Sequence, residues 1–139
     1  MPNQANTQRG KIVLASNSNL TGLEGKLVKI VSNAGGPGLF DVPAAVTDEA
    51  LFVLTDGNLH AGDPCEAIPL HSEQEVRVVA TGTGVAGARV IHDSAAYGSV
   101  KTDPGTSATT VFSPGIAEED WVAGQALLIR PAPRTIVHP

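Results

Sequence analysis

The chain has 139 residues, a length typical of one domain built around one hydrophobic core. Charged residues make up 17% of it, whereas Gly (15) and Pro (10) are frequent, and this balance favours turns and short strands over helices. Nine basic residues stand against fourteen acidic ones, and no two basic residues are adjacent. Because phosphate binding draws on clustered basic side chains, nucleic acid is excluded as an expected partner.

The first ten residues lack apolar periodicity and predict an extended arm over residues 1–10. They contain no apolar stretch of the signal-peptide kind, and no later run approaches the roughly 20 apolar residues of a membrane span. We therefore expect a soluble protein that is not secreted and has no membrane partner. Such an arm is most often a disordered terminus, but in an assembling protein it can also lie across a neighbour. The polar side chains available for that contact are Asn3, Gln4, Asn6, Gln8 and Arg9.

Residues 11–130 predict a single all-β domain, a small β-barrel or β-sandwich, because short apolar or alternating runs are separated by turn residues. The expected strands are Lys11–Ala15, Lys26–Ser32, Leu39–Val42, Ala50–Thr55, Cys65–Pro69, Glu75–Ala80, Ala88–His92, Ser99–Thr102, Thr110–Phe112 and Gln125–Arg130. Asp56-Gly57 is a hairpin signal. At most one or two short helical turns are expected, within Asp41–Ala50 and Gly115–Trp121. Residues 131–139 are expected to form a Pro-rich C-terminal tail.

An Ala-Gly turn recurs three times along the chain. The segments Gly57–Cys65 and Gly82–Val90 share the pattern Gly-x-x-x-Ala-Gly-x-x-apolar, and Trp121–Leu127 repeats its second half. The copies are unequally spaced, whereas a solenoid keeps a fixed period. We interpret them as recurrent turn chemistry in one domain, in which glycine supplies backbone freedom where strands begin.

The segment Gly82–Gly87 matches the dinucleotide-binding pattern G-x-G-x-x-G, and Asp103 follows about twenty residues later. That motif places a pyrophosphate on the first turn of a packed helix. Here the next residues, Ala88–His92, have strand-like content and stop short of Gly98. We therefore expect a glycine-rich turn and no nucleotide cofactor.

Other chemistry-bearing residues give no catalytic or metal-binding pattern. The four histidines (His60, His71, His92 and His138) lack local metal-site spacing, and Cys65 has no second thiol for a disulfide or a zinc site. Neighbouring carboxylates lie in polar, turn-like segments, whereas acid–base catalysis needs two carboxyl groups in unlike environments. We expect no enzyme, no cofactor and no metal site.

Three residues near the C-terminus are expected to contact other subunits. Trp121 stands at the start of the last strand beside three acidic residues and could be a core cap or a subunit-contact anchor, since tryptophan is enriched at interaction hot spots. Arg130 and Arg134 flank the Pro-rich segment, which offers reach beyond the domain.

Three segments together resemble a known family. They are Gly57–Asp63, Glu75–Gly87 and the hairpin His92–Thr102 with its Gly98-Ser-Val100 turn. They resemble the capsid-decoration, or head-cement, proteins of tailed bacteriophages, in which an apolar strand, a glycine, an apolar residue and Ala-Gly-Asp precede β-hairpins that end in Gly-x-Val. The copy Gly87-Ala-Arg departs from that pattern, which would place Gly-Asp there.

The resemblance spans roughly residues 10 to 130 and implies a compact β-barrel or sandwich without catalytic residues. It implies a homotrimer that sits on the exterior of a phage head and bridges capsomers of the major capsid protein. The protein would then belong to the virion and be made in the host cytoplasm. The alternative is a monomeric or dimeric β-sandwich module that binds carbohydrate or peptide, against which the scarcity of aromatic residues (4%) counts.

Overall fold

The computed structural model describes residues 10–56, 60–71 and 73–139, which form ten β-strands and no helix. The first five strands are β1 (Ile12–Ala15), β2 (Leu27–Val31), β3 (Leu39–Asp41), β4 (Phe52–Leu54) and β5 (Pro64–Pro69). The second five are β6 (Val76–Val79), β7 (Arg89–His92), β8 (Val100–Thr102), β9 (Thr110–Ala117) and β10 (Ala126–Val137). The all-β prediction is confirmed, and each expected strand corresponds to an observed one. In the absence of a helix, no described segment is a candidate for a membrane-spanning helix.

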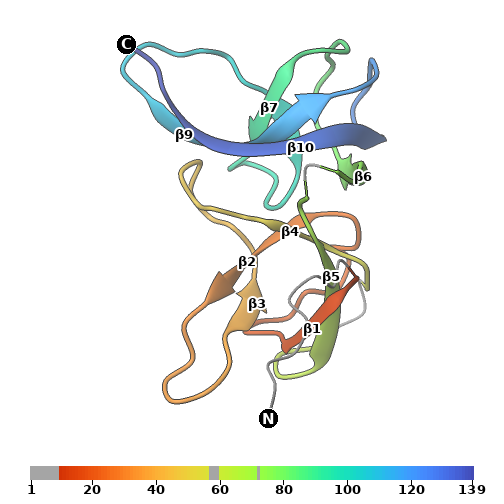
Figure 1. The fold of residues 1–139 in the computed structure, drawn as a ribbon, viewed down its shortest axis with the longest axis vertical. Helices are drawn as coiled ribbons and strands as arrows, with labels where there is room; N and C mark the ends of the chain where they lie inside the picture. Colours follow the sequence, from red (N-terminus) through yellow and green to blue (C-terminus); the bar gives the residue numbers. More distant parts are fainter. Residues whose placement is uncertain (1–9, 57–59, 72) are drawn as a thin grey trace.

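Each set of five strands forms one antiparallel sheet, and the two sheets lie one above the other in Figure 1. The strand orders are β1-β5-β4-β2-β3 in the N-terminal half and β6-β10-β9-β7-β8 in the C-terminal half. The arrangement is sandwich-like and not a closed barrel, because the outer strands of each sheet meet only at an isolated parallel bridge. These bridges are Ser16–Phe40 in the first half and Ala80–Val100 in the second.

The two halves repeat one topology, since replacing each strand of the first order by the strand five places later gives the second order. Their turns repeat it too. Gly62 N–H donates to the Ser16 carbonyl (2.9 Å), and Gly124 N–H, 62 positions later, donates to the Ala80 carbonyl (2.8 Å). Both glycines have positive φ (89° and 86°), the conformation that favours glycine.

A second turn is repeated at the same interval. Gly25 N–H donates to the Leu54 carbonyl (2.9 Å), and Gly87 N–H donates to the Ala117 carbonyl (2.8 Å). The three Ala-Gly copies therefore belong to a true internal repeat, which turn chemistry alone does not explain. Their spacing is unequal because each half contains two such turns, and the partner of Gly87 in the first half follows glutamate instead of alanine.

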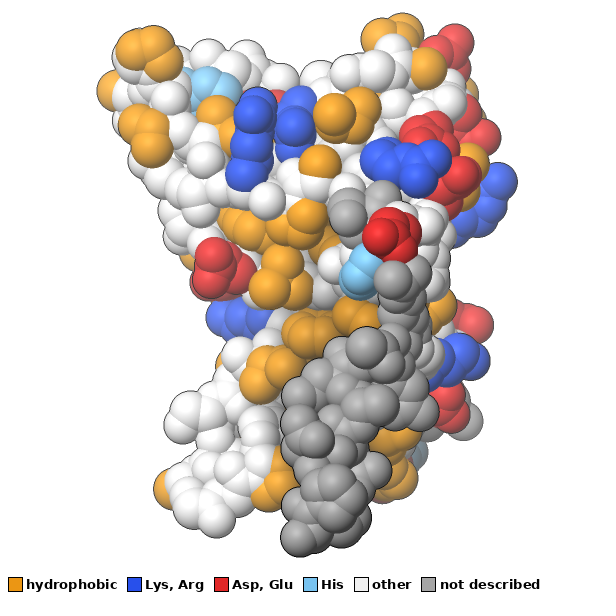
Figure 2. Space-filling view, in the orientation of Figure 1, with side chains coloured by type: hydrophobic (Ala, Val, Ile, Leu, Met, Phe, Trp, Pro, Cys, Tyr) orange, Lys and Arg blue, Asp and Glu red, His pale blue; other side chains and the backbone are white. Residues whose placement is uncertain are grey.

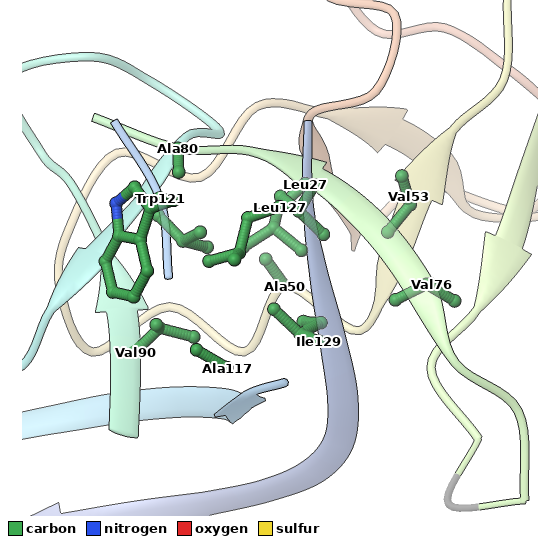
Figure 3. Close-up of a cluster of buried hydrophobic side chains, with 12 residues drawn as sticks. Leu27, Ala50, Val53, Val76, Ala80, Val90, Ala117, Trp121, Leu127 and Ile129 are labelled. Carbon is green, nitrogen blue, oxygen red and sulfur yellow. The ribbon is translucent and has the colours of Figure 1, made fainter. Parts of the chain in front are cut away.

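The halves share a hydrophobic core. The N-terminal half has its own cluster, formed by Leu20, Val28, Phe40, Leu54, Cys65 and Ala67. A larger cluster joins Leu27, Ala50 and Val53 of the first half to side chains of the second, including Leu127, Ile129 and Trp121 (Figure 3). Among the described residues, three backbone hydrogen bonds join the halves, from Leu27 N–H to the Gly98 carbonyl (2.7 Å), from Val79 N–H to the Gly25 carbonyl (2.9 Å) and from Phe112 N–H to the Val46 carbonyl (2.7 Å).

Residues 131–137 are part of β10, so the expected Pro-rich tail over 131–139 is wrong for these residues. Strand β10 pairs with β9 as far as Val137 opposite Thr110, and the two strands form a long curved ribbon (Figure 1). The register shifts between Pro131 and Arg134. A bulge or an edge tolerates proline, which lacks an N–H for the ladder. The end of the chain is fixed as well, since Ser107 Oγ donates to the Pro139 carbonyl (2.7 Å).

Candidate interaction surfaces

The structure assigns Trp121 to the interior. Its side chain is only 3% exposed, its indole N–H donates to the Thr81 carbonyl (3.1 Å), and the ring covers Gly84 so closely that a Cβ there would overlap it. Of the two roles that the sequence left open, the core role is therefore correct. Trp121 is not a surface anchor, because the body of its own chain already encloses the ring.

The other predicted contact residues have different surroundings. Asn3, Gln4, Asn6, Gln8 and Arg9 lie outside the described residues. Arg130 is exposed and forms ion pairs with Glu118 (2.7 Å) and Glu75 (3.1 Å) within its own chain. Arg134 is also exposed and pairs with Ser113 in the β9–β10 ladder, but its side chain has no hydrogen bond or ion pair among the residues that the structure describes.

Arg134 lies close to Arg89, a residue that the sequence analysis did not select. The Arg89 guanidinium donates through Nη1 to the Ala132 carbonyl (2.8 Å) and to Ser113 Oγ (3.3 Å). Partial burial and the repulsion of the Arg134 charge lower the pKa of Arg89, which nevertheless stays ionised because a guanidinium keeps its proton in proteins. Figure 2 shows two basic side chains side by side on the upper half of the molecule. We call Arg89 and Arg134 the guanidinium pair.

Acidic side chains collect on the other side of the same half, next to β6 and around the β9–β10 connection. Glu119 receives hydrogen bonds from Leu128 N–H (3.1 Å) and Arg77 (3.0 Å), and the first of these is the main cause of its lowered pKa. Glu75 and Glu118 share Arg130. We call Glu75, Glu118 and Glu119 the acidic edge; Figure 2 shows red and blue side chains intermingled there.

An apolar tip is formed by Val85 and Val122, each 63% exposed. Both valines sit on turns held by the antiparallel bridge between Gly84 and Trp121. Side chains fix these turns further, because the Asp120 carboxylate accepts from Ala86 N–H (2.8 Å) and the Gln125 amide oxygen accepts from Val122 N–H (3.3 Å). The tip is therefore rigid as well as apolar.

Two buried titratable side chains, His92 and Cys65, stay neutral. Burial lowers the pKa of His92, whose side chain is fully buried and whose Nε2 accepts from Gly98 N–H (3.1 Å), which leaves the ring proton on Nδ1. Burial raises the pKa of the Cys65 thiol to about 11, so the side chain acts as a small apolar group. Within the described ranges, no three His, Cys, Asp or Glu side chains are grouped as metal ligands.

The glycine-rich segment Gly82–Gly87 leads into strand β7, not into a helix, so the expected turn is confirmed. A pyrophosphate therefore finds no helix N-terminus behind this loop. No family model matches the chain, and a search among curated proteins also finds no match.

The features that the sequence analysis missed are Arg89, Val85 and Val122. Arg89 stands in a run of strand-like residues, and only tertiary structure brings it next to Arg134. Val85 follows Gly84 and Val122 precedes Ala123-Gly124, both in turns, where an apolar side chain carries no periodicity that would mark it as exposed.

Proposed function

We propose that the protein is a structural capsid-decoration protein that binds the exterior of a tailed-bacteriophage head as a homotrimer and stabilises contacts between capsomers. In this proposal its partners are the phage major capsid protein and further copies of itself. It acts on the virion, after synthesis in the host cytoplasm, and has no catalytic role.

The observation that carries the proposal is the rigid presentation of exposed contact groups. Val85 and Val122 project from turns that are tied by backbone and side-chain hydrogen bonds, and the Arg89 guanidinium is held by the Ala132 carbonyl. Side chains that are already ordered lose little conformational entropy on contact. An oligomer that presents several such groups binds a repetitive lattice with avidity even where each contact is weak.

The alternative, a module for carbohydrate or peptide, needs an aromatic-lined face. Tyr97 has a largely exposed ring (55%), but Phe40 and Phe52 pack edge to face (5.4 Å between ring centroids) inside the N-terminal half. Trp121 is buried. A single exposed aromatic side chain offers no stacking platform, so we favour decoration.

The test mixes the protein with undecorated phage heads and measures co-sedimentation and the rupture temperature of the heads. Bound protein is expected to raise that temperature, because a ligand that binds the intact state stabilises it. A variant with Val85→Asp and Val122→Asp should bind more weakly, while Ile30→Asp, at an exposed site (46%) in the other half, should bind like wild type. Deleting residues 1–9 should weaken binding and preserve the fold. Heads that take up no wild-type protein would contradict the proposal.

A further inference from the structure

Most bases of the described residues form ion pairs, whereas Lys26 and the two members of the guanidinium pair form none. Ion pairs within the described chain engage Lys11, Lys29, Arg77, Lys101 and Arg130. Arg134 has none, and its charge repels that of Arg89. Asp103 partly offsets the charge of Arg89 and opposes the lowering of its pKa by burial, but this carboxylate is mostly buried (8% exposed) and also bonds to His138 (3.1 Å).

The internal repeat allows Arg89 to be compared with the equivalent residue of the N-terminal half, Leu27. Arg89 lies opposite Ile116 as Leu27 lies opposite Val53, at the start of the equivalent strand. Leu27 is fully buried against the C-terminal half, and its N–H donates to Gly98. The face on which the N-terminal half carries another half-domain therefore recurs in the C-terminal half, where it is polar and carries the guanidinium pair.

We propose that the guanidinium pair of one copy binds the acidic edge of a second copy. Arginine and carboxylate form short, charge-assisted and often bidentate hydrogen bonds, and Arg89 is already oriented because its Nη1 is bonded to its own chain. The acidic edge has surplus charge, since three carboxylates (Glu75, Glu118, Glu119) share two arginines (Arg77, Arg130). The inference rests on the proposed function, whose homotrimer it supplies with a contact.

The contact joins unlike surfaces. Glu75 directly precedes β6, the outer strand of the sheet β6-β10-β9-β7-β8, whereas Arg89 begins β7 near the opposite side. Pairing either surface with its own copy would place arginine against arginine or glutamate against glutamate, so a contact through one surface of each copy is head-to-tail. Head-to-tail contacts of this kind close into a ring when the rotation permits and form a filament otherwise. The proposed trimer is such a ring, closed after three copies.

Sedimentation velocity of the full chain tests the contact. At low salt, about 50 mM, wild type is expected to sediment as an oligomer of the 14.2 kDa chain, and at about 500 mM the oligomer should weaken because salt screens exposed charges. Arg134→Glu and Glu75→Lys should each sediment as the monomer at low salt. Mixing the two variants should give a heterodimer and not the full oligomer, because each retains the surface that the other has lost, whereas a closed ring needs both surfaces on every copy. Lys11→Glu makes the same charge change as Arg134→Glu at a distant exposed site and should behave as wild type.

The contact is wrong if wild type is monomeric, if Arg134→Glu stays oligomeric, or if Lys11→Glu is disrupted equally. Circular dichroism of each variant separates loss of contact from loss of fold. Binding to heads is scored separately. Heads that bind a monomeric wild type would overturn the contact and support decoration, whereas a salt-sensitive oligomer that binds no heads would support the contact and overturn decoration.

Discussion

The N-terminal and C-terminal halves have the same strand order and fill it with different side chains. In β5, Cys65 pairs with Leu14 and Ala67 with Ile12; in β10 the equivalent positions hold Leu127 and Ile129. The larger residues of β10 are balanced elsewhere, because the C-terminal half has Val100 and Ala117 where the N-terminal half has Phe40 and Leu54. The topology is thus set by repeated turns and registers, while the total core volume can be distributed in more than one way.

The outward faces differ for a simple reason. Ile68 and Leu27 of the first half pack against the shared core, and the equivalent positions in the second half are Arg130 and Arg89. A face that is buried against the other half is apolar, and the same face at the surface is charged. At two equivalent positions of the repeat, the strand geometry is the same and burial decides whether the residue is apolar or charged.

The largest effect is expected from Trp121→Ala, which removes the biggest side chain of the shared core. The indole is buried, so its loss leaves a cavity and an unpaired Thr81 carbonyl, and unfolding should become easier by about 3–5 kcal/mol. Urea denaturation measures this. The control is Val122→Ala: Val122 is next to Trp121 in the sequence but is exposed, so this substitution should change the free energy of unfolding by no more than about 0.5 kcal/mol. A Trp121→Ala protein within about 1 kcal/mol of wild type would show that the C-terminal half does not depend on this ring.

The second prediction exchanges one equivalent pair between the halves. Ile129→Ala should cost about 2–4 kcal/mol through a cavity, and Ala67→Ile about 1–3 kcal/mol through overpacking. Because the two residues belong to separate clusters, the losses in the double variant should add to within about 0.5 kcal/mol. A double variant that recovers stability in urea denaturation would mean that the two cores are coupled.

The strands were predictable because their apolar alternation and the turn residues between them are local signals. Strands β4 and β5 pair antiparallel as expected, but the register sets Leu54 opposite Ala67, so Asp56-Gly57 belongs to a longer connection over residues 55–63; Gly57 itself lies outside the described residues. The lengths of β9 and β10 were not predictable, because proline normally ends a strand, and the register shift that accommodates Pro131 and Pro133 forms only between paired strands.

The candidate surfaces were predicted less well than the fold. Arg134 was expected from its place in the sequence, but its neighbour Arg89 is 45 positions away, and only the pairing of β7, β9 and β10 brings them together. Trp121 could not be assigned from sequence because buried and contact tryptophans have the same local surroundings. The repeat itself was visible only as turns, since the core residues of the two halves differ in type.

A smaller effect is expected from acid. Burial opposes ionisation of Asp48, but hydrogen bonds from Ala45 N–H, Lys29 and Ala44 N–H outweigh it and lower its pKa to about 2, below the ordinary value of 3.8. The carboxylate therefore stabilises the fold fully above about pH 4, and this contribution, about 1–2 kcal/mol, is lost as the pH falls toward 2. Asp48→Asn should lower stability at pH 7 and flatten the pH profile below 4 in thermal unfolding. An unchanged profile would exclude Asp48 as the titrating group.

The smallest effect is expected where the halves differ most in polarity, at Arg130. Its ion pairs with Glu75 and Glu118 are short, but the three side chains are 44%, 42% and 26% exposed, so water and salt screen the attraction. Arg130→Ile, which installs the residue of the equivalent position 68, should change the free energy of unfolding by at most about 1 kcal/mol, and less in high salt. Urea denaturation at two salt concentrations measures the change in the free energy of unfolding and its dependence on salt. A loss of several kcal/mol that persists in high salt would mean that the fold depends on the Arg130 side chain in β10. The charge at this position would then be required for folding, and solvent exposure alone would not explain why it is there.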